Sequence, residues 1–99
     1  MNLPFSFNSK VAKDLKDILA FYEEESGTSL ADAFYDELML QIGQVKKNPK
    51  QFPFSKGDRR RVNLDRFPYH FLYRIKSHSI RILVLRHHKR NPRYGNNRN

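Results

Sequence analysis

The sequence predicts an α+β domain in which an N-terminal strand and an antiparallel helical hairpin pack on a mainly antiparallel four-stranded sheet. Apolar residues recur at helical spacing in two segments joined by a short connection at Gly27. After residue 58 the pattern changes, and apolar residues alternate with polar ones in three short segments. A helical hairpin cannot bury its apolar face alone, so we expect the sheet to cover it.

The size and composition are those of one small domain. The chain has 99 residues, of which 38% are hydrophobic and 13% aromatic, so it can build a single core. We place this domain at residues 1–94 and expect the polar ending 95–99 to be disordered. The chain has no cysteine, which favours a reducing cytoplasm, and it shows neither a membrane span nor a signal peptide. We therefore expect a cytoplasmic protein that does not associate with membranes.

The first elements follow from the residues up to Gly27. Leu3–Phe7 alternates apolar residues around Pro4, which predicts a short strand at a sheet edge. Asn8 or Ser9 would then cap a helix that ends near Gly27. Spacings of four, three and four residues define its apolar stripe, Val11, Leu15, Ile18 and Tyr22. We place the following residues on its polar side: Lys10, Lys13, Asp14, Lys16 and Asp17.

The second helix begins directly after the glycine and ends before a proline. Thr28 or Ser29 would cap it, and Asn48–Pro49 would end it. Its apolar stripe consists of Leu30, Phe34, Leu38, Ile42 and Val45. Because the connection is short, the two helices should run antiparallel and share one apolar face.

Three strands are predicted after the loop 49–57, at 60–67, 69–75 and 80–86, and their short connections indicate an antiparallel meander. In the first strand Val62 and Leu64 should point inward. In the second strand one face should carry Tyr69, Phe71, Tyr73 and Ile75, opposite His70, Leu72, Arg74 and Lys76. In the third strand one face should carry Ile80, Ile82 and Val84, opposite Arg81, Leu83 and Leu85.

Charge is distributed unevenly along the chain. Residues 1–57 carry seven Lys against eight acidic residues, whereas residues 58–99 carry ten Arg and two Lys against two Asp. Arginine makes planar, bidentate contacts with phosphate and carboxylate, so this asymmetry favours a polyanionic partner, either a nucleic acid or an acidic protein segment. The alternative is a basic surface that only keeps the protein soluble.

Two stretches, Arg61–Ile75 (RVNLDRFPYHFLYRI) and Ile82–Pro92 (ILVLRHHKRNP), support a family resemblance. With them, residues 3–94 as a whole resemble the RelE/ParE superfamily of toxins from type II toxin-antitoxin systems, or plasmid stabilisation proteins. The ending Leu85–Pro92 is closer to the ParE-like branch. The resemblance implies the predicted fold and a toxin that inhibits bacterial growth, without a cofactor or metal, until a cognate acidic antitoxin neutralises it in a hetero-oligomer.

The resemblance leaves the target and the chemistry open. RelE-like members are metal-independent endoribonucleases that cut messenger RNA on the ribosome, whereas ParE-like members block DNA gyrase without enzymatic activity of their own. The basic residues and the C-terminal tyrosine that RelE-like members use correspond here to Arg61, Asn63, His70 and Tyr94. Asn63 and His70 depart from the Lys and Arg expected there, so the RelE-like catalytic set is incomplete.

RNA cleavage without a metal needs a base, an acid and cations that stabilise the charged phosphorane. Histidine titrates near neutral pH, tyrosine can donate a proton, and arginine stays charged. The catalytic candidates are Arg61, His70, Arg81, His88 and Tyr94. The candidates for binding a nucleic acid or another target are Arg59, Arg60, Arg61, Arg74, Arg81, Arg86, His87, Lys89 and Arg90.

Each candidate also has a structural interpretation. Arg74 and Arg81 could pair with Asp65 or with a carboxylate of the hairpin, and His70 could be a half-buried sheet residue. Tyr94 could pack against the core or lie in a disordered tail. If these interpretations hold throughout, the chain would be a non-catalytic or degenerate basic module that binds RNA or an acidic protein partner.

Overall fold

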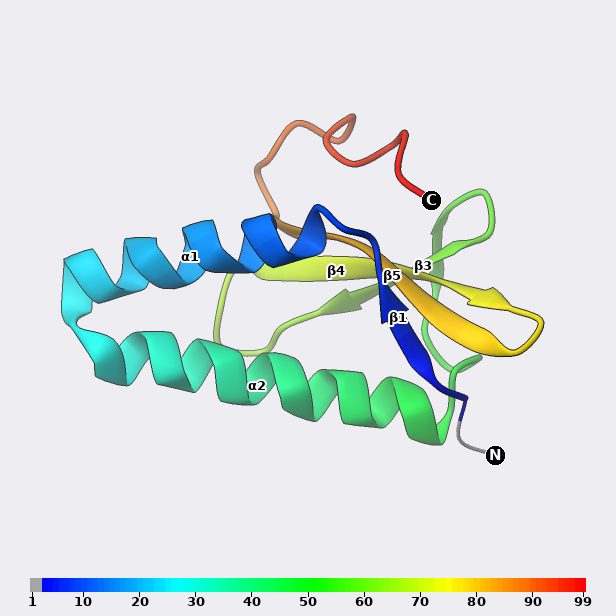
Figure 1. Ribbon diagram of the computed structural model, residues 1–99, viewed down its shortest axis with the longest axis horizontal. Helices are drawn as coiled ribbons and strands as arrows, with labels where there is room; N and C mark the ends of the chain where they lie inside the picture. The colour runs from blue at the N-terminus through cyan, green and yellow to red at the C-terminus, as the bar shows by residue number, and fades with distance from the viewer. Residues whose placement is uncertain (1–2) are drawn as a thin grey trace.

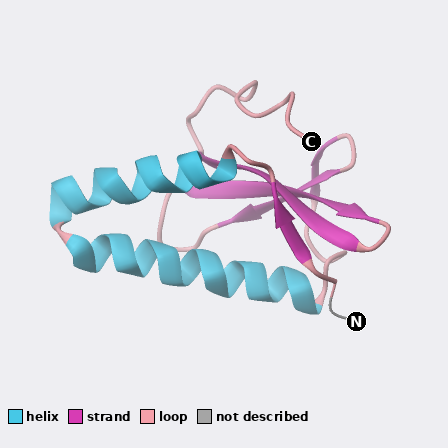
Figure 2. Ribbon diagram, in the orientation of Figure 1, coloured by secondary structure: helices cyan, strands magenta, loops and turns pink. Residues whose placement is uncertain are grey.

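The computed structural model describes residues 3–99 and confirms the α+β class (Figure 1). Its elements are, in order, β1 (Phe5–Phe7), α1 (Val11–Ser26), α2 (Thr28–Lys47), β2 (Phe54–Lys56), β3 (Arg59–Asn63), β4 (Tyr69–Lys76) and β5 (Ser79–His87). The two helices lie side by side as an antiparallel pair next to the strands (Figure 2). In the described range, neither helix is long and apolar enough to cross a membrane.

Within residues 3–99 the sheet has five strands in the order β1-β5-β4-β3-β2, so the prediction of four strands was wrong in number. The additional strand β2 has only three residues, all of them exposed, and therefore lacks the buried alternation that marks a strand in a sequence. β1 pairs in parallel with β5, while the other neighbours are antiparallel. The helical hairpin and the meander supply the long connection that a parallel pair requires.

The helical hairpin forms as predicted, but its caps differ. Gly27 is both the last cap of α1 and the first cap of α2, which leaves no room for a capping side chain. Its φ of 79° lies in the region that favours glycine. Thr28 is already helical, and α1 starts after Lys10 with no side-chain cap. Asn8 instead accepts a hydrogen bond from the Lys10 backbone N–H at 2.9 Å and turns the chain toward the helix.

The hydrophobic core lies between the hairpin and the inner face of the sheet. Phe34 and Val45 of α2 are completely buried, as the predicted stripe requires. Aromatic rings fill the end near the hairpin turn, where Phe34 meets Phe67 and Tyr69 edge-on at centroid distances of 5.1 and 5.3 Å. The other core residues contributed by the sheet include Val62, Leu64, Phe71, Tyr73, Ile80, Ile82 and Leu85.

The predicted alternation of β5 fails in its second half because the strand contains a bulge. Tyr73 pairs with Ile82, but its neighbour Leu72 pairs with Val84, so Leu83 is one residue in excess. An extra residue exchanges the two faces of the strand beyond that point. Consequently Leu85, and not Val84, joins the core under the hairpin.

Candidate functional site

The outer face of the sheet carries a chain of hydrogen bonds through two histidines. On β5, Arg86 Nε donates to His70 Nε2 on β4 at 2.9 Å, and the Nδ1 atoms of His70 and His88 are also 2.9 Å apart. Their rings are nearly coplanar, with an interplanar angle of 12°. Arg61 of β3 completes the cluster, with Nη2 3.3 Å from His88 Nδ1. The antiparallel register aligns Asn63 with His70 and His70 with Arg86, which brings these strands' side chains together.

The hydrogen bonds from Arg86 to His70 and from His70 to His88 determine the tautomers of both histidines. Arginine only donates, so His70 Nε2 must accept and its proton lies on Nδ1. That proton is donated to His88 Nδ1, so neutral His88 carries its own proton on Nε2. Burial, followed by the charges of Arg61 and Arg86, lowers the pKa of His70 to about 3. Burial and the charge of Arg61 also lower the pKa of His88. Both histidines are therefore neutral at pH 7.

Two buried arginines hold the C-terminal segment, residues 89–99, against this face. Arg59 donates to the carbonyl oxygens of Gly95, Asn96 and Arg98 at 3.0, 2.7 and 2.7 Å. Arg86 Nη1 donates to two more carbonyl oxygens of the segment, at 3.0 and 2.7 Å. Burial lowers the pKa of both guanidinium groups, because carbonyls satisfy their hydrogen bonds without neutralising their charge. The segment is thus fixed by charge-assisted hydrogen bonds.

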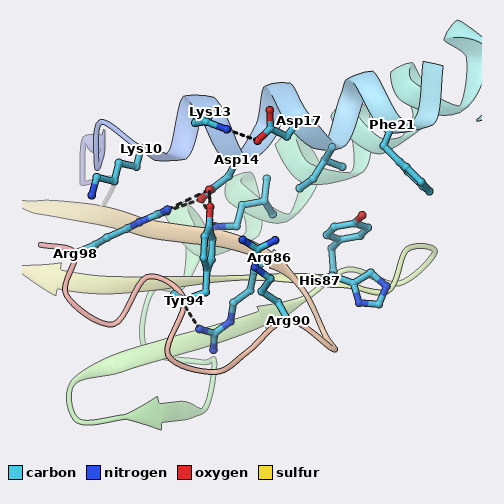
Figure 3. Close-up of a pocket in the computed structure, with 13 residues that line it drawn as sticks. Lys10, Lys13, Asp14, Asp17, Phe21, Arg86, His87, Arg90, Tyr94 and Arg98 are labelled. Carbon is cyan, nitrogen blue, oxygen red and sulfur yellow. Dashed lines mark hydrogen bonds and ion pairs between the residues drawn. The ribbon is translucent and has the colours of Figure 1, made fainter. Parts of the chain in front are cut away.

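A buried carboxylate on α1 anchors the same segment from the other side (Figure 3). Asp14, which is 4% exposed, accepts hydrogen bonds from the Tyr94 hydroxyl and from Arg98 Nη1, both at 2.5 Å. It also accepts the Leu85 backbone N–H at 3.2 Å. Arg98 donates in addition to the carbonyl oxygen of Leu83 at 3.2 Å, so a single ion pair joins α1, β5 and the C-terminal segment.

The last five residues therefore differ from the expected disordered tail. Arg98 is buried, and Gly95 lies directly over β5 with a φ of 87°. A Cβ atom at Gly95 would come within 2.7 Å of Val84 Cγ2, so only glycine allows this close approach. The polar composition of 95–99 indicated disorder, but Arg59 holds these residues through their backbone carbonyls, which leave no trace in side-chain composition.

Arg60, Arg74 and Arg81 have local partners. Arg74 pairs with Asp58 at 3.0 Å, and not with Asp65 or a carboxylate of the hairpin. Arg81, its neighbour in the β4–β5 ladder, donates to the carbonyl oxygen of residue 99 at 3.3 Å. Arg60 lies over the Phe54 ring at 4.0 Å and donates to two loop carbonyls. His87, Lys89 and Arg90 follow at the exit of β5, where Lys89 and Arg90 are exposed.

The structure therefore brings together only part of the predicted catalytic set. Arg61, His70 and His88 form one cluster on the outer face. Arg81 of β5 lies seven residues before His88, which directly follows the strand, and is roughly 20 Å away at the rise of a strand. The Tyr94 hydroxyl is turned away toward α1, where it donates to Asp14. No single substrate phosphate could contact all five groups in this arrangement.

Sequence reasoning missed Asp14 and Arg98. These two residues form the buried ion pair whose carboxylate also accepts the Tyr94 hydroxyl. The sequence placed Asp14 on the polar side of its helix, which was wrong. A signal was present, because Asp14 lies three residues after Val11 and four before Ile18, within the apolar stripe. A carboxylate in such a stripe indicates a buried, paired acid. Arg98 gave no comparable signal.

A helical hairpin packed on a five-stranded sheet, with a basic outer face and a C-terminal segment held across it, defines a small toxin-like domain of the RelE/ParE class. Residues 5–92 match a family described as ParE toxin of type II toxin-antitoxin system, parDE, and the chain belongs to this family. The match confirms the predicted superfamily and the predicted closeness to its ParE-like branch. The chain is accordingly the toxin component of a type II toxin-antitoxin system, and its partner is an antitoxin.

Solved structures support the same fold. A chromosomal ParDE TA system from P. aeruginosa superposes with a TM-score of 0.76 at 23% sequence identity, covering 86% of this chain and 95% of that one. A mutant of E. coli toxin RelE in the free state gives 0.66 at 13% identity, with coverage of 95% and 92%. The toxin-antitoxin complex RelBE2 from Mycobacterium tuberculosis gives 0.56 at 16% identity, with coverage of 88% and 99%. No curated protein matches the chain.

Proposed function

We propose that this toxin inhibits bacterial growth by binding DNA gyrase, as its ParE-like character implies, and that it does not cleave messenger RNA. The observation that carries the proposal is the state of the acid–base groups on the outer face. Both ring nitrogens of His70, Nδ1 of His88 and the Tyr94 hydroxyl are already committed to hydrogen bonds inside the protein. The family match over residues 5–92 supports the same branch.

The histidines are poorly suited to proton transfer. A general base must accept the proton of the 2′-hydroxyl, but the only lone pair of neutral His88, on Nδ1, already receives the His70 proton. A general acid must be protonated near neutral pH, but burial and the neighbouring arginines lower the pKa of both histidines. His70 is also only 1% exposed and out of reach of a substrate.

Tyr94 is equally constrained as a proton donor. Its hydroxyl hydrogen is donated to the carboxylate of Asp14 at 2.5 Å, and Arg90 and Arg98 lie over its ring at 4.0 and 4.8 Å. To protonate a leaving oxygen, the side chain would have to break this bond and leave Asp14 with fewer partners in a buried site, which is unfavourable. Tyr94 therefore serves to hold the C-terminal segment.

An acidic antitoxin fits the distribution of charge. Residues 58–99 have a net charge of +10, and their arginines suit bidentate contacts with carboxylates. An antitoxin that covers this surface would exclude the target by competition. The opposite charges of toxin and antitoxin would also accelerate their association. We expect the resting form to be a cytoplasmic toxin-antitoxin hetero-oligomer.

Induced expression in cells tests the proposal. The chain is expressed alone or together with the antitoxin, with plasmid topology and the integrity of a translated messenger measured from the same culture. We expect growth arrest with relaxed plasmids and intact messenger, and normal growth when the antitoxin is present. Cleaved messenger with normal supercoiling would contradict the proposal in favour of the RelE-like alternative. Growth unaffected by the chain alone would favour a degenerate module.

A further inference from the structure

A row of four cations crosses the outer face of the sheet near the turn between β2 and β3. Lys56 of β2 pairs with Arg59 of β3. The register of the next ladder places Arg59 opposite Arg74 of β4, which in turn pairs with Arg81 of β5. Like charges directly opposite one another in a sheet are destabilising. The row is therefore a place where bound negative charge would stabilise the fold.

The protein supplies only part of this negative charge. Within residues 3–99 the one ion pair of the row joins Arg74 Nε to Asp58 at 3.0 Å. Arg59 is 7% exposed, and its three acceptors are carbonyl oxygens of the C-terminal segment, which carry no net charge. Lys56 is exposed and forms no ion pair with a carboxylate of the described range. Two adjacent positive charges, one buried and one exposed, therefore remain without a counter-charge.

A pocket of 240 Å³ opens at this end of the row, where the β2–β3 turn meets the C-terminal segment. Figure 1 shows the C-terminus beside this turn. The residues that line the pocket are Lys56, Gly57, Asp58, Arg59, Arg74 and Asn96. Arg74 uses only its Nε for Asp58, so both of its Nη groups are left, and the side chains of Lys56 and Asn96 make no hydrogen bond within residues 3–99. The pocket thus offers free donors from β2, β4 and the C-terminal segment to one ligand.

The size and charge of the pocket define its ligand. Its volume is below the roughly 300–1,000 Å³ of pockets that enclose a drug-sized molecule, so it admits a single small anion. The two unneutralised charges of Lys56 and Arg59 favour a dianion over a singly charged group. A phosphate monoester carries a charge of about −1.5 to −2 at pH 7 and three strong acceptor oxygens, and a guanidinium group such as that of Arg74 binds phosphate with two parallel hydrogen bonds. A phosphodiester of a nucleic acid carries only one negative charge and fits less well.

We propose that this pocket binds a phosphate dianion, either inorganic phosphate or the terminal phosphate of a monoester, on Lys56, Arg74 and Asn96 above the buried charge of Arg59. Asp58 does not prevent this, because its side chain is 67% exposed to solvent and already paired with Arg74. The site involves neither the histidines nor gyrase, so it stands or fails independently of the proposed function.

The bound anion would also fix the C-terminal segment. Asn96 lines the pocket, while its carbonyl oxygen accepts a hydrogen bond from Arg59 at 2.7 Å. An anion on the Asn96 amide would thus add a second contact to the residue that Arg59 already holds. It would also offset the uncompensated charge of Arg59, which the segment covers.

The first experiment titrates inorganic phosphate into isotope-labelled toxin at constant ionic strength and follows the backbone amide of Gly57 by NMR. We expect a saturable shift. Lys56→Gln and Asn96→Ala should each weaken the affinity about tenfold, the effect of losing one hydrogen bond to a charged group. The matched controls are Lys76→Gln and Asn97→Ala, which change an exposed lysine and an exposed asparagine outside the pocket and should leave the affinity unchanged. The spectra also show whether each variant is folded.

Two further ligands and one variant test the charge of the ligand. Methyl phosphate keeps the dianion and should bind as inorganic phosphate does, whereas dimethyl phosphate, a singly charged diester, should bind at least tenfold more weakly. Asp58→Asn removes the carboxylate from the lining and should tighten phosphate binding. Failure of methyl phosphate to bind would identify the free anion as the ligand. Equal binding of dimethyl phosphate would overturn the assignment of a dianion.

Hydrogen exchange tests the effect on the C-terminal segment. Saturating phosphate should slow exchange of the Asn96 and Arg98 amides, which donate to carbonyl oxygens within the segment. Phosphate also stabilises proteins in general by being excluded from their surface, so the same concentration is added to Lys56→Gln toxin, where exchange should slow much less. Equal slowing in Lys56→Gln and Lys76→Gln toxin would overturn the coupling. No saturable shift in the wild type, or equal affinity of pocket and control variants, would overturn the site itself.

Discussion

Replacing Asp14 by Asn should destabilise the domain more than any other conservative change of a charged residue on α1. The substitution keeps the volume and one acceptor oxygen for Tyr94, but it removes the negative charge that faces Arg98. The two side chains are 1% and 8% exposed, so the remaining guanidinium would be an uncompensated buried charge. Breaking a buried pair in this way costs about 3–5 kcal/mol.

A loss of this size is a large share of the stability of a small domain, which is about 5–15 kcal/mol. It corresponds to a decrease of roughly 12 °C or more in the unfolding midpoint of a chain this short. Urea unfolding followed by circular dichroism measures the effect as a lower midpoint at unchanged slope. Asp17→Asn is the matched control, because it breaks the exposed pair with Lys13 on the same helix and should not measurably change the midpoint.

A double substitution separates the loss of the Asp14–Arg98 attraction from the cost of leaving the Arg98 charge buried without a partner. Asp14→Asn combined with Arg98→Met should be more stable than Asp14→Asn alone, because no buried charge remains. A loss below about 1 kcal/mol for Asp14→Asn, or a double variant less stable than the single one, would refute the role of this pair.

Three further predictions follow from the outer face and the segment that covers it. Gly95→Val should lower the urea midpoint and release the segment, because its Cβ would lie 2.7 Å from Val84 Cγ2 and its φ is positive; a midpoint equal to wild type would contradict this packing. His70 should remain neutral in an NMR titration from pH 7 down toward its folded pKa of about 3, well below its ordinary value of 6.5. Because His70 binds a proton at a higher pH in the unfolded chain than in the folded protein, its contribution to stability is fully present above pH 6.5 and falls as the pH decreases below that value. Titration of His70 near pH 6.5 in the folded protein would refute its burial. Arg59→Gln should accelerate hydrogen exchange of the amides at 96–98, because the side chain holds three carbonyls of this segment, and unchanged exchange would show that other contacts suffice.

The elements predicted best are those whose periodicity is read directly from side chains. The stripe that includes Phe34 and Val45 gave the second helix and its buried face, and the alternation of Tyr69, Phe71 and Tyr73 gave the inner face of β4. These patterns are local, since each depends only on neighbours within a turn or a strand. The short connections between them were enough to predict the hairpin and the antiparallel meander.

The features that sequence reasoning missed depend on backbone groups or on a shift of register. The bulge at Leu83 changes the face of Leu85 without any change in the hydrophobic pattern, because both faces of β5 are buried at this point. Arg59 holds the C-terminal segment through backbone carbonyl oxygens. Every residue has such an oxygen, so the sequence does not indicate which residues Arg59 binds. The sequence identified Arg61, His70 and His88 as candidate residues. The tautomers of the two histidines follow only from the distances between their ring nitrogens and the neighbouring donors.

Gyrase inhibition and messenger cleavage can be compared in a pair of assays on one purified preparation of the toxin. It is added to DNA gyrase with relaxed plasmid and ATP, and in parallel to ribosomes translating a defined messenger. We expect supercoiling to be inhibited in a concentration-dependent manner, the antitoxin to reverse this inhibition, and the messenger to remain intact. Cleavage of the messenger on the ribosome, with supercoiling unaffected, would contradict this expectation.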